Sequence, residues 1–254
     1  MSVASVGFHC PECSKQGKQR VYTASTIMGG GSSPIVTQVL IGINVAVYLI
    51  GLGKTFFTID YGVLGSAQIQ LPTGQIVTLP GFGVAHGEWY RLVTGGFLHA
   101  NILHIAMNMF GLWILGSQLE AAVGRLRFAV VYGSALLAGS FGVMLLSPHE
   151  PTVGASGAIF GLLGLALAAQ RSQGINIMQS GLGGILLINL AFTFGVSGIS
   201  IGGHIGGLIG GYLCGAVLYE LGPRLRNATL TVALCGAIGV LCFVGGIVAA
   251  GASA

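Results

Sequence analysis

Apolar segments about as long as a membrane is thick recur along this chain, and they constrain its fold more than any other feature. An α-helix needs about 20 mostly apolar residues to cross the hydrocarbon core of a bilayer. Segments of this kind lie at 34–53, 100–119, 127–147, 154–170, 182–198, 201–221 and 229–252. The pattern predicts an all-α polytopic membrane protein with six core spans and a seventh span at the C-terminal end.

The composition agrees with a closely packed bundle of membrane helices. Charged residues make up 6% of the chain, against about 25% in an average soluble protein. Glycine supplies 45 of the 254 residues, and 53% of the residues are hydrophobic, which excludes collagen repeats and disordered linkers. In a bilayer, glycine lets helix backbones approach closely where lipid gives no hydrophobic push between them.

The basic residues predict the orientation of the spans. Cytoplasmic loops of membrane proteins carry an excess of Lys and Arg. With a cytoplasmic N-terminus, only Lys54 and Arg91 fall outside, and the inner side receives Lys15, Lys18, Arg20, Arg125, Arg127, Arg171, Arg224 and Arg226. Spans two, four and six then begin at the outer face. Because the basic residues sit at segment ends, the net charge of +4 gives no reason to expect a nucleic-acid partner.

Residues 1–33 are predicted to be a polar cytoplasmic segment without a secretory signal, since they lack an apolar core with a cleavage site. Cys10 and Cys13, with His9 beside them, resemble half of a zinc knuckle. Zinc takes four ligands, so a truncated module or two free thiols is favoured over a metal site. The connection at 54–91 is too long for a plain linker, and we expect it to fold onto the membrane surface.

Four polar side chains in the predicted spans fall at one depth. His104 and Asn108 lie four residues apart in span two, one helical turn apart on the same face. Ser156 lies near the start of span four, and His204 lies near the start of span six. Polar groups inside a span are costly, usually face the bundle interior and mark function. The sequence therefore predicts a functional site near the outer face.

Glycine ladders flank two of these side chains and would let their helices cross closely. Span four carries Gly154, Gly157, Gly161 and Gly164, while span six carries Gly202, Gly206 and Gly210 in one register and Gly203, Gly207 and Gly211 in another. Span four is also short, which places its start below the surface and leaves room for water above it. A serine hydroxyl and an imidazole are thereby expected to meet in a wet pocket.

These residue types suit acyl transfer. Ser156 could attack a carbonyl carbon while His204 takes its proton and returns it to the leaving group. His104, Asn108 and the backbone N–H of Ser156 could donate hydrogen bonds to the oxyanion. No Asp or Glu falls at this depth to orient the imidazole, so we predict a dyad rather than a triad, without a cofactor.

Supporting roles are expected for four further residues: close packing for Gly154 and Gly157, stacking on the His204 ring for Phe160, and a tether of the outer loop for His99. Taken singly, Ser156 is typical of a packing serine, and His104 and Asn108 are typical of hydrogen bonds between helices. The shared depth of the four polar groups favours catalysis over these structural interpretations.

The motifs resemble those of the rhomboid family of intramembrane serine proteases. "HANILHIAMN" around His104 and Asn108, "GASG" around Ser156 and "GHIGG" around His204 occur in the family's order. The segments "EWYR", "GSQLE" and "GRLRF" also look like family features. The resemblance runs from about Pro34 to Arg224. It implies a six-span catalytic core at 34–224, with 225–254 as an added helix.

The resemblance also implies a function. Membrane-anchored proteins would be the substrates, cleaved at or near their transmembrane segments, with Ser156 as nucleophile, His204 as base, and His104 and Asn108 as oxyanion donors. The expected location is the bacterial inner membrane. Gly203 and Phe160 depart from the family's frequent alanine and tyrosine without removing a reacting group.

Two alternatives belong to other functional classes. A catalytically inactive relative that binds membrane proteins would be expected to lack the serine or the histidine, and both are present. A small-solute transporter would be expected to show inverted repeats and helices broken at the midplane. The sequence shows no such internal symmetry, and its polar cluster lies at the outer end of the spans.

Overall fold

The computed structural model describes residues 2–3, 8–9, 33–54, 56–71 and 74–253. The chain divides into two units, Met1–Ser33 and Pro34–Ala254. In the first unit, β1 (Ser2–Val3) pairs antiparallel with β2 (Phe8–His9). Cys10, Cys13 and the side chain of His9, the three groups of the possible metal site, lie outside what the structure describes.

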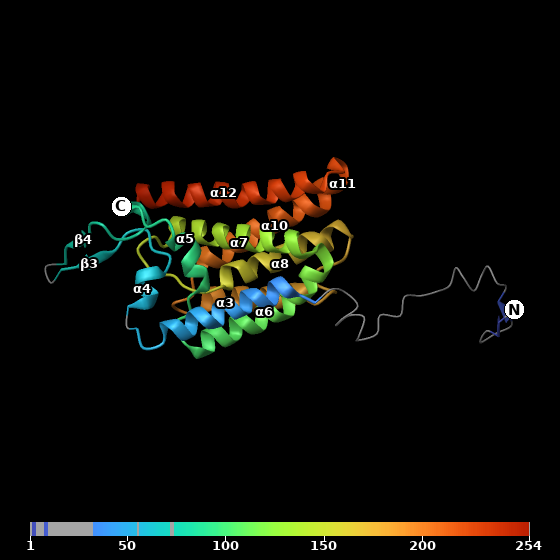
Figure 1. Cartoon of the computed structure of the whole chain (residues 1–254), viewed down its shortest axis with the longest axis horizontal. Coiled ribbons are helices and arrows are strands. Elements are labelled where there is room, and N and C mark those ends of the chain that lie inside the picture. The colour runs from blue at the N-terminus through green and yellow to red at the C-terminus, as the bar shows by residue number, and fades with distance from the viewer. Residues whose placement is uncertain (1, 4–7, 10–32, 55, 72–73, 254) are drawn as a thin grey trace. The chain divides into compact units, whose positions relative to one another are not determined.

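Long helices form most of the second unit (Figure 1). They are α3 (Ile35–Gly51), α6 (Ile102–Val123), α7 (Arg125–Leu146), α8 (Ser156–Ser172), α9 (Leu182–Gly195), α10 (Ile201–Ala216) and α12 (Ala228–Ala252). Each begins within two residues of a predicted span. The predicted all-α polytopic fold is therefore confirmed.

Within the described residues, four helical stretches are long and apolar enough to cross a membrane: α6, α7, α12 and Ile201–Leu225. The last of these continues α10 through the π-helical η3 (Val217–Leu221) and the short α11 (Gly222–Leu225). Helices α3 and α9 are shorter apolar helices. That all seven long helices cross the bilayer remains a prediction.

The connection between α3 and α6 has a fold of its own. It contains α4 (Phe57–Tyr61), a hairpin of β3 (Gln68–Gln70) and β4 (Ile76–Thr78), η1 (Val84–His86), α5 (Arg91–Thr94) and η2 (Gly95–Phe97). Its anchor is Arg91, which is fully buried. The Arg91 guanidinium donates to Glu88 Oε2 at 2.7 Å and to the carbonyl oxygens of Ile59 and Gly62 at 2.7 and 3.1 Å.

Helix α10 packs backbone to backbone against α7 and α8, and successive glycines of its two registers face different neighbours. A β-carbon at Gly207 would collide with the carbonyl of Gly157 in α8. One at Gly206 would collide with the carbonyl of Ala138 in α7. The close crossing predicted from the ladders is therefore present, because only glycine leaves room for it.

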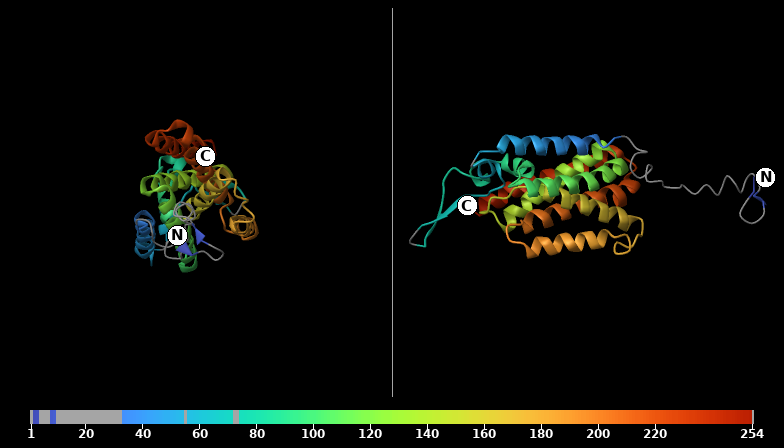
Figure 2. Two further views of the ribbon diagram at one scale, coloured as in Figure 1. Left: turned by 90° about the vertical axis from the view of Figure 1, so that its right-hand side faces the viewer. Right: turned by 90° about the horizontal axis from the view of Figure 1, so that it is seen from below.

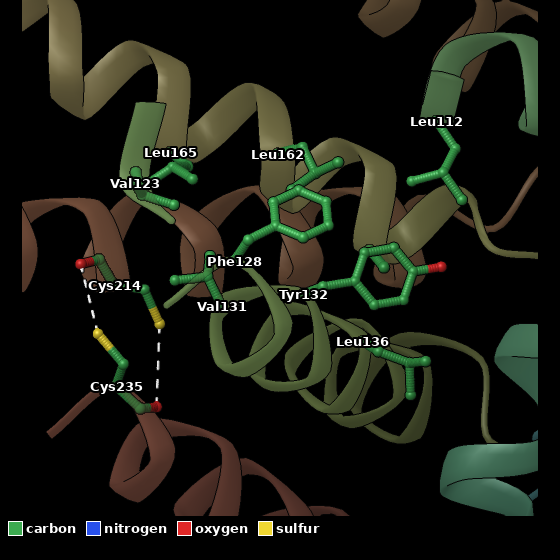
Figure 3. Packing of buried hydrophobic residues seen from close by; sticks show 11 residues of the cluster. Leu112, Val123, Phe128, Val131, Tyr132, Leu136, Leu162, Leu165, Cys214 and Cys235 are labelled. Atoms are coloured by element: carbon green, nitrogen blue, oxygen red, sulfur yellow. Dashed lines mark hydrogen bonds between the residues drawn. The ribbon is translucent and has the colours of Figure 1, made fainter. Parts of the chain in front are cut away.

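Apolar side chains of α7 and α8 fill the centre of the bundle (Figure 3). Helix α12 is attached to this bundle by hydrogen bonds between side chains and backbone carbonyl groups. Cys214 of α10 and Cys235 of α12 each donate an S–H to the other's carbonyl oxygen, at 3.9 and 3.6 Å. Ser134 of α7 donates to the same Cys235 carbonyl at 2.8 Å. These contacts fix α12 against α7 and α10.

Glu120 near the end of α6 holds the start of α3. Its carboxylate accepts hydrogen bonds from the Val36 N–H at 3.0 Å, the Thr37 N–H at 2.8 Å and the Thr37 hydroxyl at 2.8 Å. A negative charge is stabilised at a helix N-terminus, where N–H groups lack intrahelical partners. This buried acid therefore joins two helices and lies about 24 Å along α6 from His104, at roughly 1.5 Å per residue.

Candidate active site

The hydroxyl of Ser156 and the imidazole of His204 meet between the starts of α8 and α10. The distance from His204 Nε2 to Ser156 Oγ is 2.8 Å, which is a hydrogen bond of ordinary length. Ser156 is half-buried and His204 is 9% exposed. The backbone packing of α8 on α10 produces this approach, because the two glycine ladders bring the helix axes close together.

The chain enters α8 through a turn that only glycine adopts readily. Gly154 has φ +127°, a conformation that side-chain-bearing residues rarely take. Its N–H donates to the carbonyl of Gly95 at 2.9 Å, and Thr152 forms a β-bridge with Val63. These contacts hold the segment before α8 against the connection between α3 and α6. Ser156 is the first residue of α8, so its N–H has no intrahelical acceptor.

His104 faces this turn from α6. A β-carbon built on Gly154 would lie 2.7 Å from His104 Nε2 and 3.7 Å from Ser156 Oγ, so the ring and the hydroxyl flank the same small space. The Ala100 N–H points at His104 Nδ1 from 3.5 Å. That contact favours the tautomer with its proton on Nε2, the nitrogen that faces Gly154.

Asn108 lies one turn further along α6 and is 6% exposed. Its amide donates to the backbone oxygen of His104 at 2.9 Å, which uses one of its two N–H groups. Asn101 caps the same helix by accepting the His104 N–H at 2.9 Å. The start of α6, and with it the ring of His104, is thereby held in a defined place.

Two aromatic contacts hold the histidine rings. Phe160 stacks on His204 with a centroid distance of 4.0 Å and an interplanar angle of 16°. His99, which is buried, packs edge-on against His104 with a centroid distance of 5.1 Å and an angle of 67°. Gly157 lies against the backbones of Gly139 and Gly203, so it belongs to the close packing of three helices.

Thr193 was not among the residues singled out in the sequence, yet it contacts His204 directly. Its hydroxyl lies 2.7 Å from His204 Nδ1, the nitrogen opposite the one that faces Ser156. The predicted dyad rested on the absence of an acidic side chain at this depth, and a hydroxyl can also accept a proton from an imidazole N–H. A signal was present, because span five runs outward in the predicted orientation and places Thr193, close to its end, near the depth of His204.

Side chains from α6, α8 and α10 and the first N–H of α8 gather at this site. Among the residues that the structure describes, no group of three or more His, Cys, Asp or Glu residues could hold a metal ion. At the start of α8, the Ser156 hydroxyl lies beside the His204 imidazole, and the His104 imidazole faces the adjacent Gly154. This arrangement can perform acyl transfer.

Comparison with known proteins places the chain in a family. The family model described as "Rhomboid domain" matches residues 86–221. The chain belongs to the rhomboid family. The match contains His104, Asn108, Ser156, Thr193 and His204, while α12 lies outside it. The family match and the apolar helices together show that the chain is an integral, multi-pass membrane protein.

Relatives occur in bacteria and plants. The "Rhomboid protease GluP" of Bacillus subtilis (strain 168) is 35% identical over 241 residues, which cover 89% of this chain and 43% of that protein. The "Putative rhomboid protease YdcA" of the same organism is 36% identical over 157 residues, 57% of this chain and 77% of that protein. The "RHOMBOID-like protein 6, mitochondrial" of Arabidopsis thaliana is 36% identical over 143 residues, 53% of this chain and 45% of that protein. The chain thus spans less than half the length of the first and third of these relatives.

Proposed function

We propose that this rhomboid-family protein is an intramembrane serine endopeptidase. It hydrolyses peptide bonds in or next to the transmembrane segments of membrane-anchored proteins, with Ser156 as nucleophile and His204 as general base. The observation that carries the proposal is the 2.8 Å contact between Ser156 Oγ and His204 Nε2. Relatives whose names include "rhomboid protease" support the same activity.

Acylation begins with a proton transfer. The Ser156 hydroxyl donates its proton to His204 Nε2 while Oγ attacks the carbonyl carbon of the scissile peptide bond. The carbonyl oxygen becomes an oxyanion in the tetrahedral intermediate. His204 then returns the proton to the leaving nitrogen, the C–N bond breaks, and an ester joins the substrate's acyl group to Ser156.

Deacylation repeats these steps with water. His204 takes a proton from a water molecule, which attacks the ester carbonyl carbon. The second tetrahedral intermediate collapses, the proton returns to Ser156 Oγ, and the carboxylic acid product leaves. The half-buried position of Ser156 leaves an approach for that water.

Three donors suit the oxyanion. The Ser156 N–H stands at the positive end of α8, His104 Nε2 faces Gly154 beside Ser156 Oγ, and Asn108 has a second amide N–H. Fixed donors of this kind stabilise the charge that develops in the transition state more than the neutral ground state. We assign His104, Asn108 and the Ser156 N–H to this role.

We assign the catalytic core to residues 34–224 and an additional transmembrane helix to residues 225–254. The proposed location is the bacterial inner membrane, with a cytoplasmic N-terminus and the site open to the outer face. The basic residues support this orientation. Arg171, at the end of α8, and Arg125, at the start of α7, both lie at the opposite helix ends from Ser156.

The test replaces the reacting groups. Ser156→Ala and His204→Ala should each abolish cleavage of a single-span substrate and labelling by a fluorophosphonate probe, with folding retained. Ser172→Ala is the matched control, because Ser172 lies exposed at the other end of α8 and its hydroxyl donates only to the carbonyl of Ala169. Cleavage by Ser156→Ala at the wild-type rate would exclude Ser156 as the nucleophile and would mean that another group reacts. A folded wild-type protein that neither cleaves the substrate nor reacts with the probe would favour a non-catalytic or transport role.

A further inference from the structure

We propose that Thr193 of α9 is a positioning residue for the base: its hydroxyl fixes the tautomer and the orientation of the His204 imidazole. This inference rests on the proposed function, in which His204 Nε2 must be unprotonated to accept the serine proton. Thr193 would thus be a third member of the site, supplied by a helix that carries none of the reacting groups.

The hydrogen bonds around Thr193 determine which atom carries each proton. The Thr193 hydroxyl lies 2.7 Å from the carbonyl oxygen of Asn189 and 2.7 Å from His204 Nδ1. A carbonyl oxygen can only accept, so the single hydroxyl proton goes to Asn189. Oγ1 is then the acceptor for a proton on His204 Nδ1. This places the lone pair on Nε2, where Ser156 Oγ–H lies 2.8 Å away.

The opposite arrangement would disable the base. If the Thr193 hydroxyl donated to Nδ1, the proton of the neutral ring would be on Nε2, and Nε2 could not accept from Ser156. The Asn189 contact at 2.7 Å would also lose its donor. For a neutral imidazole, only one assignment satisfies all three short contacts, and it is the one in which His204 can act as a base.

Burial gives an independent reason to assign Thr193 a specific role. Only three of the 14 residues of α9 are buried: Leu182, Gly183 and Thr193. The helix lies at the edge of the bundle in both views of Figure 2. Thr193, 2% exposed, is the one buried polar residue of this helix, and it faces His204. The other two buried residues lie at the start of α9, about three helical turns from Thr193.

A hydroxyl suits this place better than an acid does. An ionised carboxylate inside a membrane span is expensive unless it is paired. A threonine whose proton is already donated to its own helix presents an acceptor without a net charge. Substitution at this position should therefore weaken the reaction less than the roughly 10⁴-fold loss that follows replacement of the aspartate in a soluble serine protease.

The experiment compares Thr193→Val with Thr193→Ser in the full chain. Valine keeps the shape and removes the acceptor, whereas serine keeps the hydroxyl. Thr231→Val is the matched control, because Thr231 is also buried, its hydroxyl also donates to its own helix (Ala228 O, 2.8 Å), and it lies in α12 away from the site. The readouts are kcat and KM on a single-span substrate, the rate of fluorophosphonate labelling, and the ¹⁵N spectrum of labelled histidine, in which a His204→Gln sample identifies the His204 signals.

Thr193→Val should lower kcat about tenfold with KM changed less than about twofold, the rate equivalent of one hydrogen bond of about 1.4 kcal/mol. Its ¹⁵N spectrum should show protonated Nε2 where the wild type shows protonated Nδ1. Thr193→Ser should keep kcat within about threefold of the wild-type value and should show protonated Nδ1 in its ¹⁵N spectrum. Thr231→Val should change neither kcat nor the spectrum.

An unchanged His204 tautomer in folded Thr193→Val would overturn the inference, as would equal losses of kcat in Thr193→Val and Thr231→Val. The tautomer is measured without a substrate. Failure of the proposed serine peptidase function, shown by cleavage in Ser156→Ala or by a folded wild type that does not cleave, is therefore a separate outcome.

Discussion

Replacing Gly154 by alanine puts a methyl group between the His104 imidazole and the Ser156 hydroxyl. The new β-carbon would lie 2.7 Å from His104 Nε2 and 2.9 Å from His104 Cε1, closer than real β-carbons approach other atoms. The φ of +127° adds backbone strain of about 1–3 kcal/mol, which alanine bears and glycine does not. His104 must rotate or α6 must shift, and either movement removes one of the proposed oxyanion donors.

The loss of one donor costs about 10²–10³-fold in kcat. Gly154→Ala should therefore lower kcat by at least about 100-fold, and the strain should lower the free energy of unfolding by about 1–3 kcal/mol. Cleavage kinetics on a single-span substrate and thermal unfolding in the same detergent measure the two effects. Gly111→Ala is the control, since its β-carbon would meet only Ile159 at an ordinary 3.5 Å.

A double-mutant cycle tests whether the effect acts through His104. In the His104→Ala background the methyl group introduced by Gly154→Ala has space, so this second substitution should lower kcat by less than about tenfold. A full additional loss of about 100-fold in that background would refute the reasoning, as would wild-type kcat in folded Gly154→Ala.

Two further predictions concern the scaffold of the site. Gly207→Ala puts a methyl group onto the Gly157 carbonyl and should cost about 1–3 kcal/mol of stability and at least about tenfold in activity, whereas Gly236→Ala, which meets only Val130 at 3.9 Å, should cost little in thermal unfolding or cleavage assays. Burial by itself raises the pKa of Glu88, but the hydrogen bonds from Arg91, the Gly83 N–H and the Tyr90 hydroxyl outweigh it and hold the pKa below its ordinary value of 4.5. A carboxyl whose pKa is lower in the folded state stabilises the protein at pH values above its unfolded-state pKa, and this stability is lost as the pH falls through the folded-state pKa. Below about pH 4.5 the unfolding temperature should therefore fall more in the wild type than in Glu88→Gln. An equal pH dependence in both proteins would contradict this.

The helices and the approach of Ser156 to His204 could be predicted from the sequence. The starts of α8 and α10 match predicted spans within two residues, and the polar groups placed at one depth include Ser156 and His204, which the structure brings to 2.8 Å. This was possible because hydropathy and the distribution of basic residues give each residue a position along the membrane normal. The motifs around these residues also resemble those of the family to which the chain belongs.

The direction in which a side chain points around its helix was harder to predict. Both glycine registers of α10 were visible in the sequence, but it did not show that Gly206 would face α7 and Gly207 would face α8. Likewise, Arg91 could be placed in the long connection but not recognised as its buried anchor, because its partners Ile59 and Gly62 lie 32 and 29 residues away.

The sequence alone determined that the chain is a bundle of membrane helices with a serine, two histidines and an asparagine near one end. Tertiary packing decided the rest: which nitrogen of His204 faces Ser156, how Gly154 makes room for His104, and that Thr193 of α9 contacts His204. The bilayer sorts residues by depth through composition alone. Which of the residues at one depth touch one another depends on helix rotation and crossing, and these are fixed by contacts between segments that are distant in the chain.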